Sequence, residues 1–299
     1  MKPESPDSDR QLPAVEFRGV SFSFDDAPVL DQVSFELGRG QMIVITGASG
    51  SGKSVLLRLA VGLMHPDSGQ ILVDGTEISG LPEDELLEIR SRSLGLVFQE
   101  DTLFTGMSVY ENTAYRLTEH GWSEADTDRA VKEILTFVGL AKDVDKLPEE
   151  LSIGMGRRLE LARALVGWPS IMFFDEPTSG LDPINARQVL DLIILARDAH
   201  EISSLVVTKE LHQIPHLVHH QAIEDETGEV TIQRIDGTHD PNVKVMVLEK
   251  GEIAFFGSPE EFQNSTLPAV VYLTHPETGL HMSDEYFRDP WSSSRKKKD

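Results

Sequence analysis

Apolar and polar positions along the chain follow two different periods. Residues 14–24 and 29–37 alternate apolar with polar side chains, which is typical of paired, half-buried strands. An apolar run over 42–45 predicts a further strand. Continuous apolar runs predict parallel strands buried on both faces, and they occupy residues 94–98, 171–174 and 204–207.

Segments with helical spacing lie between these runs. We expect helices over 55–64, over 83–92 with Pro82 at the first turn, and over 183–197. The alternation of strands and helices predicts an α/β fold with a parallel sheet. Residues 108–144 are helical and acidic and interrupt that alternation, so they predict an inserted helical lobe spanning about 100–165.

The remaining segments suggest how the chain is divided. We expect a main domain over 14–262, preceded by a disordered leader over 1–13 that is rich in Pro, Ser and Asp. Short strands are expected at 69–75, 243–248 and 252–256, and a surface hairpin insertion at about 221–242 with a possible strand over 230–235. A C-terminal extension, 263–299, ends in a basic tail that either approaches anionic lipid headgroups or is simply solvated.

Composition narrows the function classes. The 299 residues carry a formal net charge of −23, which argues against a broad nucleic-acid surface because duplex binding needs clustered Lys and Arg. With no cysteine, the chain has neither disulfides nor a thiol metal site, and a reducing compartment is expected. It has no apolar signal core and no run near the ~20 apolar residues that span a bilayer. We therefore expect a soluble protein, or one that is peripheral through a partner.

Residues 47–54 read Gly-Ala-Ser-Gly-Ser-Gly-Lys-Ser, between the strand at 42–45 and the helix at 55–64. This G-x-x-x-x-G-K-[ST] pattern predicts a phosphate-binding loop, in which glycines allow backbone N–H groups to turn toward polyphosphate at a helix N-terminus. Lys53 is expected to reach the β- and γ-phosphates, and the Ser54 hydroxyl to help hold Mg²⁺. The predicted nucleotide-binding residues of this loop are Gly47, Ala48, Ser49, Gly50, Ser51, Gly52, Lys53 and Ser54.

Two carboxylates, Asp175 and Glu176, directly follow the strand at 171–174. Asp175 is placed to hold Mg²⁺ through water, and Glu176 to orient the attacking water as a base. Structural caps are the alternative interpretation. Gln99 ends the strand at 94–98, where its amide is expected to touch both the metal and that water.

Together with these residues, Leu-Ser-Ile-Gly-Met at 151–155 and Ser-Gly-Leu-Asp at 179–182 closely resemble the ATPase subunits of ABC transporters over roughly residues 15–262. The resemblance implies a P-loop NTPase core of α/β class, with an N-terminal antiparallel β subdomain and an inserted α-helical subdomain. It implies ATP and Mg²⁺ as cofactors. It also implies a homodimer, or a dimer with a related ATPase, in which Ser152 and the Gly154 amide bind the other subunit's γ-phosphate and Asp182 lies at the interface.

The same resemblance assigns two further places. Phe24 stands where the family stacks an aromatic ring on adenine, and a core position is the alternative. The sequence around Gln99, together with Met155, Arg157 and Arg158, looks like the ATPases of bacterial MCE-type lipid transporters. That likeness implies integral membrane permease subunits, a periplasmic MCE-type lipid-binding partner, phospholipid or other hydrophobic cargo, and a peripheral location on the cytoplasmic face of the inner membrane. A soluble ABC protein acting on nucleic acid is the rival, disfavoured by the acidic charge and the single phosphate loop.

The chain departs from the family pattern at two positions. Lys209 stands in place of the switch histidine, and an ammonium does not shuttle a proton near neutral pH as imidazole does. Ile153 stands in place of the first signature glycine. Two hypotheses remain for the rate: ATP is hydrolysed slowly with Glu176 as base and Lys209 as electrostatic substitute, or the chain is a nucleotide clamp that needs another ATPase.

Three histidines and the C-terminal extension leave alternatives open. His212, His216 and His220 recur four residues apart, which makes a metal site on one helical face an alternative to solvated imidazoles, although Pro215 is expected to interrupt that helix. His212 is also an alternative for the switch role. The extension after Phe262 is a candidate for embracing the other subunit or a small regulator.

Overall fold

The computed structural model describes residues 12–99, 102–224, 230–235 and 240–274. Most of the predicted leader, the basic tail and two parts of the predicted insertion at 221–242 lie outside the described residues. Within the described residues, no helix has the length and apolar character needed to cross a membrane.

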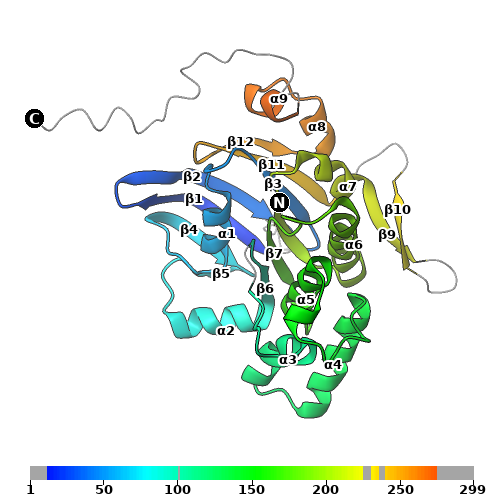
Figure 1. Cartoon of the computed structure of the whole chain (residues 1–299). Helices are drawn as coiled ribbons and strands as arrows, with labels where there is room; N and C mark the ends of the chain where they lie inside the picture. Colours follow the sequence, from blue (N-terminus) through cyan, green and yellow to red (C-terminus); the bar gives the residue numbers. More distant parts are fainter. Residues whose placement is uncertain (1–11, 100–101, 225–229, 236–239, 275–299) are drawn as a thin grey trace, which may run out of the picture.

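A six-stranded sheet forms the centre of the molecule (Figure 1). Its order is β12-β11-β3-β8-β7-β6, and every neighbouring pair is parallel except β12 with β11. All six strands were expected from the sequence, within about two residues, and they are β3 (Met42–Thr46), β6 (Leu94–Val97), β7 (Ile171–Asp175), β8 (Ser203–Val207), β11 (Val243–Glu249) and β12 (Glu252–Gly257). The carboxyl ends of the parallel strands therefore meet at one edge.

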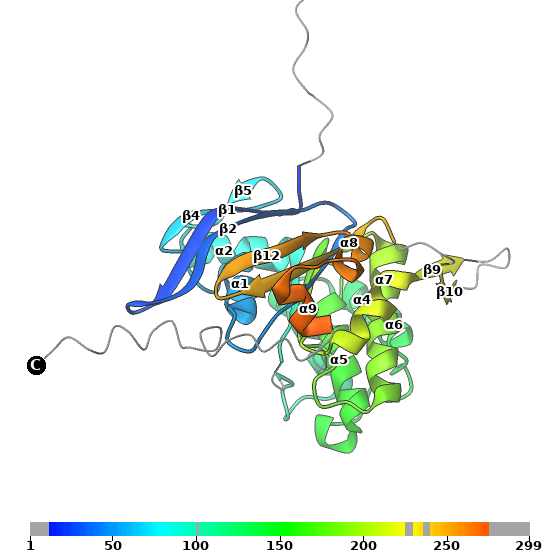
Figure 2. The ribbon, with the colours of Figure 1, turned by 90° about the horizontal axis from the view of Figure 1, so that it is seen from above.

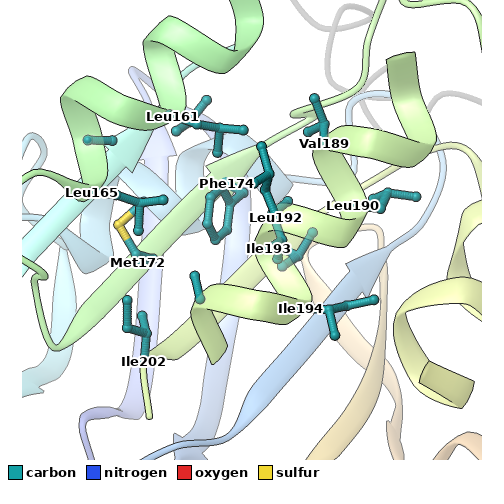
Figure 3. Close-up of a cluster of buried hydrophobic side chains, with 14 of the residues drawn as sticks. Leu161, Leu165, Met172, Phe174, Val189, Leu190, Leu192, Ile193, Ile194 and Ile202 are labelled. Atoms are coloured by element: carbon teal, nitrogen blue, oxygen red, sulfur yellow. The ribbon is translucent and has the colours of Figure 1, made fainter. Parts of the chain in front are cut away.

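This sheet is buried on both faces. Along β3, Met42 and Val44 belong to one apolar cluster, whereas Ile43 and Ile45 belong to another. On the first face, Phe174 of β7 points toward α5 (Ile153–Leu165) and α6 (Pro183–His200), as Figure 3 shows. Burial on both faces explains the continuous apolar runs in the sequence.

A four-stranded antiparallel sheet lies against the second apolar cluster, and its order is β2-β1-β4-β5. Phe17 of β1 stacks on Phe35 of β2 with ring centroids 4.7 Å apart. The strands are β1 (Val15–Phe24), β2 (Ala27–Leu37), β4 (Ser68–Val73) and β5 (Thr76–Glu77), and the helices that also contribute to this cluster are α1 (Lys53–Ala60) and α2 (Glu83–Ser93). The predicted fold class, α/β with an antiparallel subdomain, is confirmed.

Helices follow β6, as the acidic segment predicted. The lobe contains α3 (Val109–Glu119) and α4 (Glu124–Phe137), and a short 3-10 turn, η1 (Pro148–Glu150), leads into α5. Ser108 and Glu111 form a reciprocal cap at the start of α3. Helical structure ends at Phe137 in α4 and not near residue 144 as expected.

A separate two-stranded antiparallel sheet, β9 (His220–Glu224) with β10 (Val230–Arg234), lies in the region of the predicted insertion. Asp198 of α6 accepts a hydrogen bond from the Ala222 N–H at 2.7 Å, and buried Arg197 pairs with buried Asp240 at 2.8 Å. The first contact joins the hairpin to α6, and the second joins to α6 the segment that leads into β11.

Three helix predictions need correction or addition. The helix expected over 55–64 is α1, which begins at Lys53 because Gly52 takes the left-handed φ of 101° as its N-cap, and ends at Ala60, two residues before Gly62 with φ 67°. Pro215 does not interrupt a helix, because it lies in the first turn of α7 (Ile214–His219), after the 3-10 turn η2 (Leu211–Gln213). Helix α8 (Pro259–Gln263) lies at the end of the predicted main domain and α9 (Pro268–Thr274) lies in the extension, and the sequence pattern indicated neither helix.

Replacement of Gly95 in β6 by alanine should destabilise the protein by about 1–3 kcal/mol, because overpacking a filled core forces its neighbours to move. A Cβ at this position would lie 2.2 Å from Sδ of Met172 and 2.5 Å from the carbonyl oxygen of Ala164. Urea unfolding measures the change. Gly80→Ala is the matched control, because a Cβ there meets nothing within 4 Å, and equal effects of the two substitutions would contradict this packing.

Candidate functional site

The phosphate loop links β3 to α1 through backbone that only glycine adopts easily. Gly47, Gly50 and Gly52 have φ values of 145°, 78° and 101°. A Cβ on Gly47 would lie 2.1 Å from the carbonyl oxygen of Leu248, and one on Gly52 would lie 2.7 Å from Cδ2 of Leu30. The loop therefore needs these glycines both for its conformation and for its close approach to β11 and β2.

Lys53 is held inside the loop. Its Nζ donates to the carbonyl oxygens of Gly47 at 2.9 Å and Ala48 at 2.8 Å, and the residue is 7% exposed. Burial lowers the pKa of Lys53, while the nearby carboxylates of Glu176 and Asp175 oppose that shift. The loop thus carries a cation at its centre, at the first residue of α1, which suits it to an anion with several oxygens.

Ser54 and Asp175 come together from different elements. The hydroxyl of Ser54 in α1 donates to Oδ1 of Asp175 at the end of β7, at 3.1 Å. Asp175 is 6% exposed, and burial raises the pKa of its carboxyl group, although the Ser54 hydrogen bond acts in the opposite direction. A hydroxyl and a buried carboxylate are oxygen ligands of the kind that Mg²⁺ uses beside phosphates, so this pair fits the predicted metal.

Glu176 follows β7 in a left-handed backbone conformation, with φ 47°. Such a conformation costs about 1–3 kcal/mol in a residue other than glycine, and it is held here by the Glu176 N–H, which donates to the carbonyl oxygen of Val207 at 3.0 Å. Strain that directs a carboxylate side chain at the edge where Asp175 also lies is typical of functional sites.

Lys209, which follows β8, contacts Glu176 directly. Its Nζ lies 2.6 Å from Oε2 of Glu176, an oxygen that solvent does not reach. The contact meets the distance of an ion pair but not the angles of a well-formed hydrogen bond. This contact raises the pKa of the half-exposed Lys209 ammonium. Lys209, which departs from the family pattern, therefore forms an ion pair with Glu176, which conforms to it.

Gln99 and Phe24 lie at two margins of this site. Gln99 is exposed just beyond β6, next to β7 in the sheet, and its backbone carbonyl accepts from Arg157 Nη2 at 3.4 Å. Phe24 ends β1 with 49% of its surface exposed and contacts the buried ring of Phe22 edge-on at 5.0 Å. Phe24 is thus not a core residue. The roles predicted for both stay predictions.

Ser152, Gly154 and Asp182 form a second cluster, at the N-termini of α5 and α6. Ser152 caps α5 by accepting from the Met155 N–H at 3.3 Å, and Asp182 caps α6 by accepting from the N–H groups of Ile184 at 3.0 Å and Asn185 at 3.2 Å. A Cβ on Gly154 would lie 2.1 Å from Oδ1 of Asn185. These hydrogen bonds stay within the first turn of each helix, and none of them reaches the phosphate loop.

Two apolar side chains project from this second cluster. Ile153 is 77% exposed and Ile184 is 73% exposed, each near the N-terminus of its helix. Ile153 therefore fills no cavity of its own chain. Asn185, which the sequence reasoning did not single out, joins the two helices, and no motif or spacing indicated it.

The three histidines are not on one helical face. His212 is exposed in η2, whereas His216 Nδ1 lies 3.1 Å from His220 Nδ1 and His216 Nε2 lies 2.7 Å from Oδ1 of Asp191. No group of three side chains suited to a metal ion occurs among the described residues. The proposed metal site is therefore not supported by the geometry.

Comparison with known proteins identifies a family whose sequence model this chain matches. Residues 30–179 match the family model described as ABC transporter. A Mycobacterium leprae protein, named as a probable ribonucleotide transport ATP-binding protein, is 40% identical over 200 residues, covering 67% of this chain and 57% of that protein. The Arabidopsis thaliana chloroplast protein named trigalactosyldiacylglycerol 3 is 37% identical over 266 residues, covering 86% of this chain and 72% of that protein.

Solved structures share the fold. A subunit described as part of an ABC transporter complex from Clostridium perfringens superposes with a TM-score of 0.71 and 25% identity, covering 88% of this chain and 96% of that one. The chain spans between about half and two thirds of the length of the first curated relatives it matches.

Neutralising the buried carboxylate of Asp175 should stabilise the folded protein. Since burial raises the pKa of Asp175, the folded protein binds that proton more tightly than the unfolded chain, so ionisation at neutral pH costs stability. In the absence of nucleotide and Mg²⁺, we expect Asp175→Asn to raise Tm at pH 7 by on the order of 2 °C, with the gain vanishing below the ordinary pKa of aspartate.

Asp182→Asn is the matched control for this prediction. The hydrogen bond from the Asn185 side chain is the largest of the effects that lower the pKa of Asp182, so its ionised form is favoured by folding and the same substitution should lower Tm at pH 7. Thermal melts at pH 7 and at pH 3 measure both variants. A fall in Tm for Asp175→Asn at pH 7 would contradict the cost assigned to its charge.

Proposed function

Because the chain belongs to the ABC transporter family, we propose that it binds ATP with Mg²⁺ at residues 47–54, hydrolyses it, and powers transport by membrane partners. The observation that carries this proposal is the convergence of Lys53, Ser54, Asp175 and Glu176 at one edge of the sheet. A cation, a hydroxyl and two carboxylates in this arrangement match the parts that phosphoryl transfer needs.

Each residue would contribute a separate step. Lys53 would exchange its two loop carbonyls for β- and γ-phosphate oxygens, and Ser54 with Asp175 would hold Mg²⁺. The metal would supply positive charge against the phosphate oxygens. Glu176 would orient water and accept its proton while the water oxygen bonds to the γ-phosphorus and the bond to the leaving ADP breaks.

Because Lys209 pairs with Glu176, the carboxylate must be released from Lys209 before it can act as the base in hydrolysis. While its ammonium lies 2.6 Å from Glu176, the carboxylate is occupied by an opposite charge. Arrival of the γ-phosphate would offer the ammonium a second anion, and its transfer would free Glu176 to bind water. This account favours slow hydrolysis by this chain over the alternative of a nucleotide clamp that needs another ATPase.

The second cluster supports a composite site. We propose that a second copy, or a related ATPase, packs on Ile153 and Ile184, whose exposure leaves an apolar surface beside the two helix N-termini. There Ser152 and the Gly154 amide would meet the γ-phosphate bound by the partner, since the N-terminus of α5 favours negative charge. Asp182 would lie at the same interface.

An aromatic surface follows Gln99 on the helical lobe and is a candidate for the membrane subunits. Phe104 and Tyr115 are both 38% exposed, and their ring centroids are 4.7 Å apart. Arg163 lies 5.1 Å from the centroid of Phe104 and fixes the local backbone by donating to the carbonyl oxygen of Thr102 at 2.6 Å. A rigid, exposed aromatic pair is the kind of surface that protein partners bind.

We propose a hydrophobic cargo, phospholipid in particular, moved with MCE-type partners at the cytoplasmic face of the membrane. The proposal is supported by the sequence around Gln99 and by the relative whose name is that of a galactolipid. The relative named for ribonucleotide transport supports a hydrophilic cargo as the alternative.

Loss of the base tests hydrolysis. In the transporter assembled with its partners, Glu176→Gln should reduce phosphate release by about 100-fold, because a general base contributes roughly 10²–10⁴-fold to the rate. Glu210→Gln, the same substitution on the loop after β8, is the control and should leave the rate within about twofold of the wild type. If Glu176→Gln and wild type release phosphate equally fast, the chain acts as a clamp.

Mild-detergent co-purification of the tagged chain tests the partners and cargo. We expect an integral membrane permease and enriched phospholipid with the wild type, and loss of both with Phe104→Asp. Trp122→Asp, at another exposed aromatic of the lobe with 45% exposure, should retain them. Recovery of a hydrophilic solute-binding protein in place of lipid would overturn the cargo proposal.

A further inference from the structure

A cavity of about 540 Å³ lies beside the phosphate loop. Its walls come from the start of β2 (27–31), the loop itself (47–51) and the turn between β11 and β12 (247–251). A fourth wall comes from Ala269 and Leu273 of α9. The volume is typical of small-molecule sites, which range over roughly 300–1,000 Å³.

The cavity lies on one side of the phosphate loop, and the side chains proposed to act on the γ-phosphate lie on the other. In the sheet order, β11 and β12 flank β3 on one side, while β8 and β7, which carry Lys209, Asp175 and Glu176 at their ends, flank it on the other. A triphosphate whose terminal phosphate lies at Glu176 must therefore direct its nucleoside toward the β11 side. That is the side on which the cavity opens.

The lining suits a nucleoside. Val29, Leu30 and Val247 join Ala269 and Leu273 in a mostly apolar wall, and the ionisable side chains among the lining residues are Asp31, Glu249 and Lys250. Carboxylates repel phosphate but accept hydrogen bonds from sugar hydroxyls or base amino groups. Phe24 does not line the cavity, yet it pairs across the β1–β2 hairpin with Ala27, which does.

Helix α9 is held in place by packing of its own. Val270 is 1% exposed within the apolar cluster on the first face of the sheet, and α9 contacts both β11 and β12. Figure 1 and Figure 2 both place α9 next to β12. Ala269 and Leu273 of the same helix pack at the edge of this cluster and also line the cavity, so the packing of α9 fixes the wall that they form.

We propose that Ala269 and Leu273 of α9 form the apolar wall of the nucleoside subsite within the same chain, so that the C-terminal extension sets the affinity for the nucleoside part of the nucleotide. This inference rests on the proposed ATP binding at residues 47–54. It assigns the extension a role in its own subunit. The phosphate loop supplies affinity for the polyphosphate, and α9 supplies affinity for what is attached to it.

The two contributions separate when ATP is compared with inorganic tripolyphosphate, which has no nucleoside. In calorimetric titrations of the full chain with Mg²⁺, Leu273→Asp should weaken ATP binding about tenfold or more and leave tripolyphosphate binding within about twofold, because loss of an apolar pocket contact typically costs about tenfold or more. Leu267→Asp, which precedes α9, is 45% exposed and does not line the cavity, should change neither affinity.

A second variant keeps the test independent of helix detachment. Ala269→Phe adds bulk toward the cavity without adding charge, so it should also weaken ATP and spare tripolyphosphate. Unchanged ATP affinity in both variants, or equal weakening of both ligands, would overturn the inference. Wild type that binds neither ligand, or Lys53→Ala that binds both as wild type does, would instead overturn the proposed ATP site, which makes the two failures distinguishable.

Discussion

The phosphate loop lies so close to the end of β11 that the backbone of one excludes any side chain on the other. A Cβ at Gly47 would meet the Leu248 carbonyl oxygen at 2.1 Å, and one at Gly52 would meet Leu30 at 2.7 Å. This approach fixes where α1 begins, and so places Lys53 inside the loop and Ser54 against Asp175. The same approach makes the β11–β12 turn one wall of the adjoining cavity. Binding groups and cavity are therefore positioned by one steric constraint.

Around that loop, two residues have features that cost stability and that a purely structural sheet edge would not need. Burial disfavours the charge of Asp175 and raises its pKa, and Glu176 keeps a left-handed backbone. Strand β8 stabilises Glu176, through the Val207 carbonyl that accepts from its N–H and through Lys209 beyond the strand, whereas the Ser54 hydroxyl favours the charge of Asp175. Groups that are costly alone and satisfied by a phosphate with its metal are consistent with a site organised for a ligand.

The buried strands and the loop could be predicted because their signals are local. Apolar runs mark strands covered on two faces, and the spacing of glycines, lysine and serine at 47–54 needs no distant information. The contact of Lys209 with Glu176, the place of Asn185 against Gly154 and the wall formed by α9 all join segments distant in sequence. Pro215 was misjudged because proline ends a helix in its interior but suits its first turn, and only the observed start at Ile214 distinguishes the two cases.

The near-contact of Gly154 with Asn185 has a mechanical consequence. With no Cβ at Gly154, the amide side chain of Asn185 lies against the first turn of α5 while it also bonds the cap of α6. Because this is a packing contact, the start of α5 cannot move toward α6 without displacing Asn185 and the cap of α6, and α6 packs in the same apolar cluster as Phe174 of β7, next to Asp175. A displacement that presses the tip of α5 toward α6 would therefore be passed through Asn185 to the helix that packs on the strand carrying Asp175.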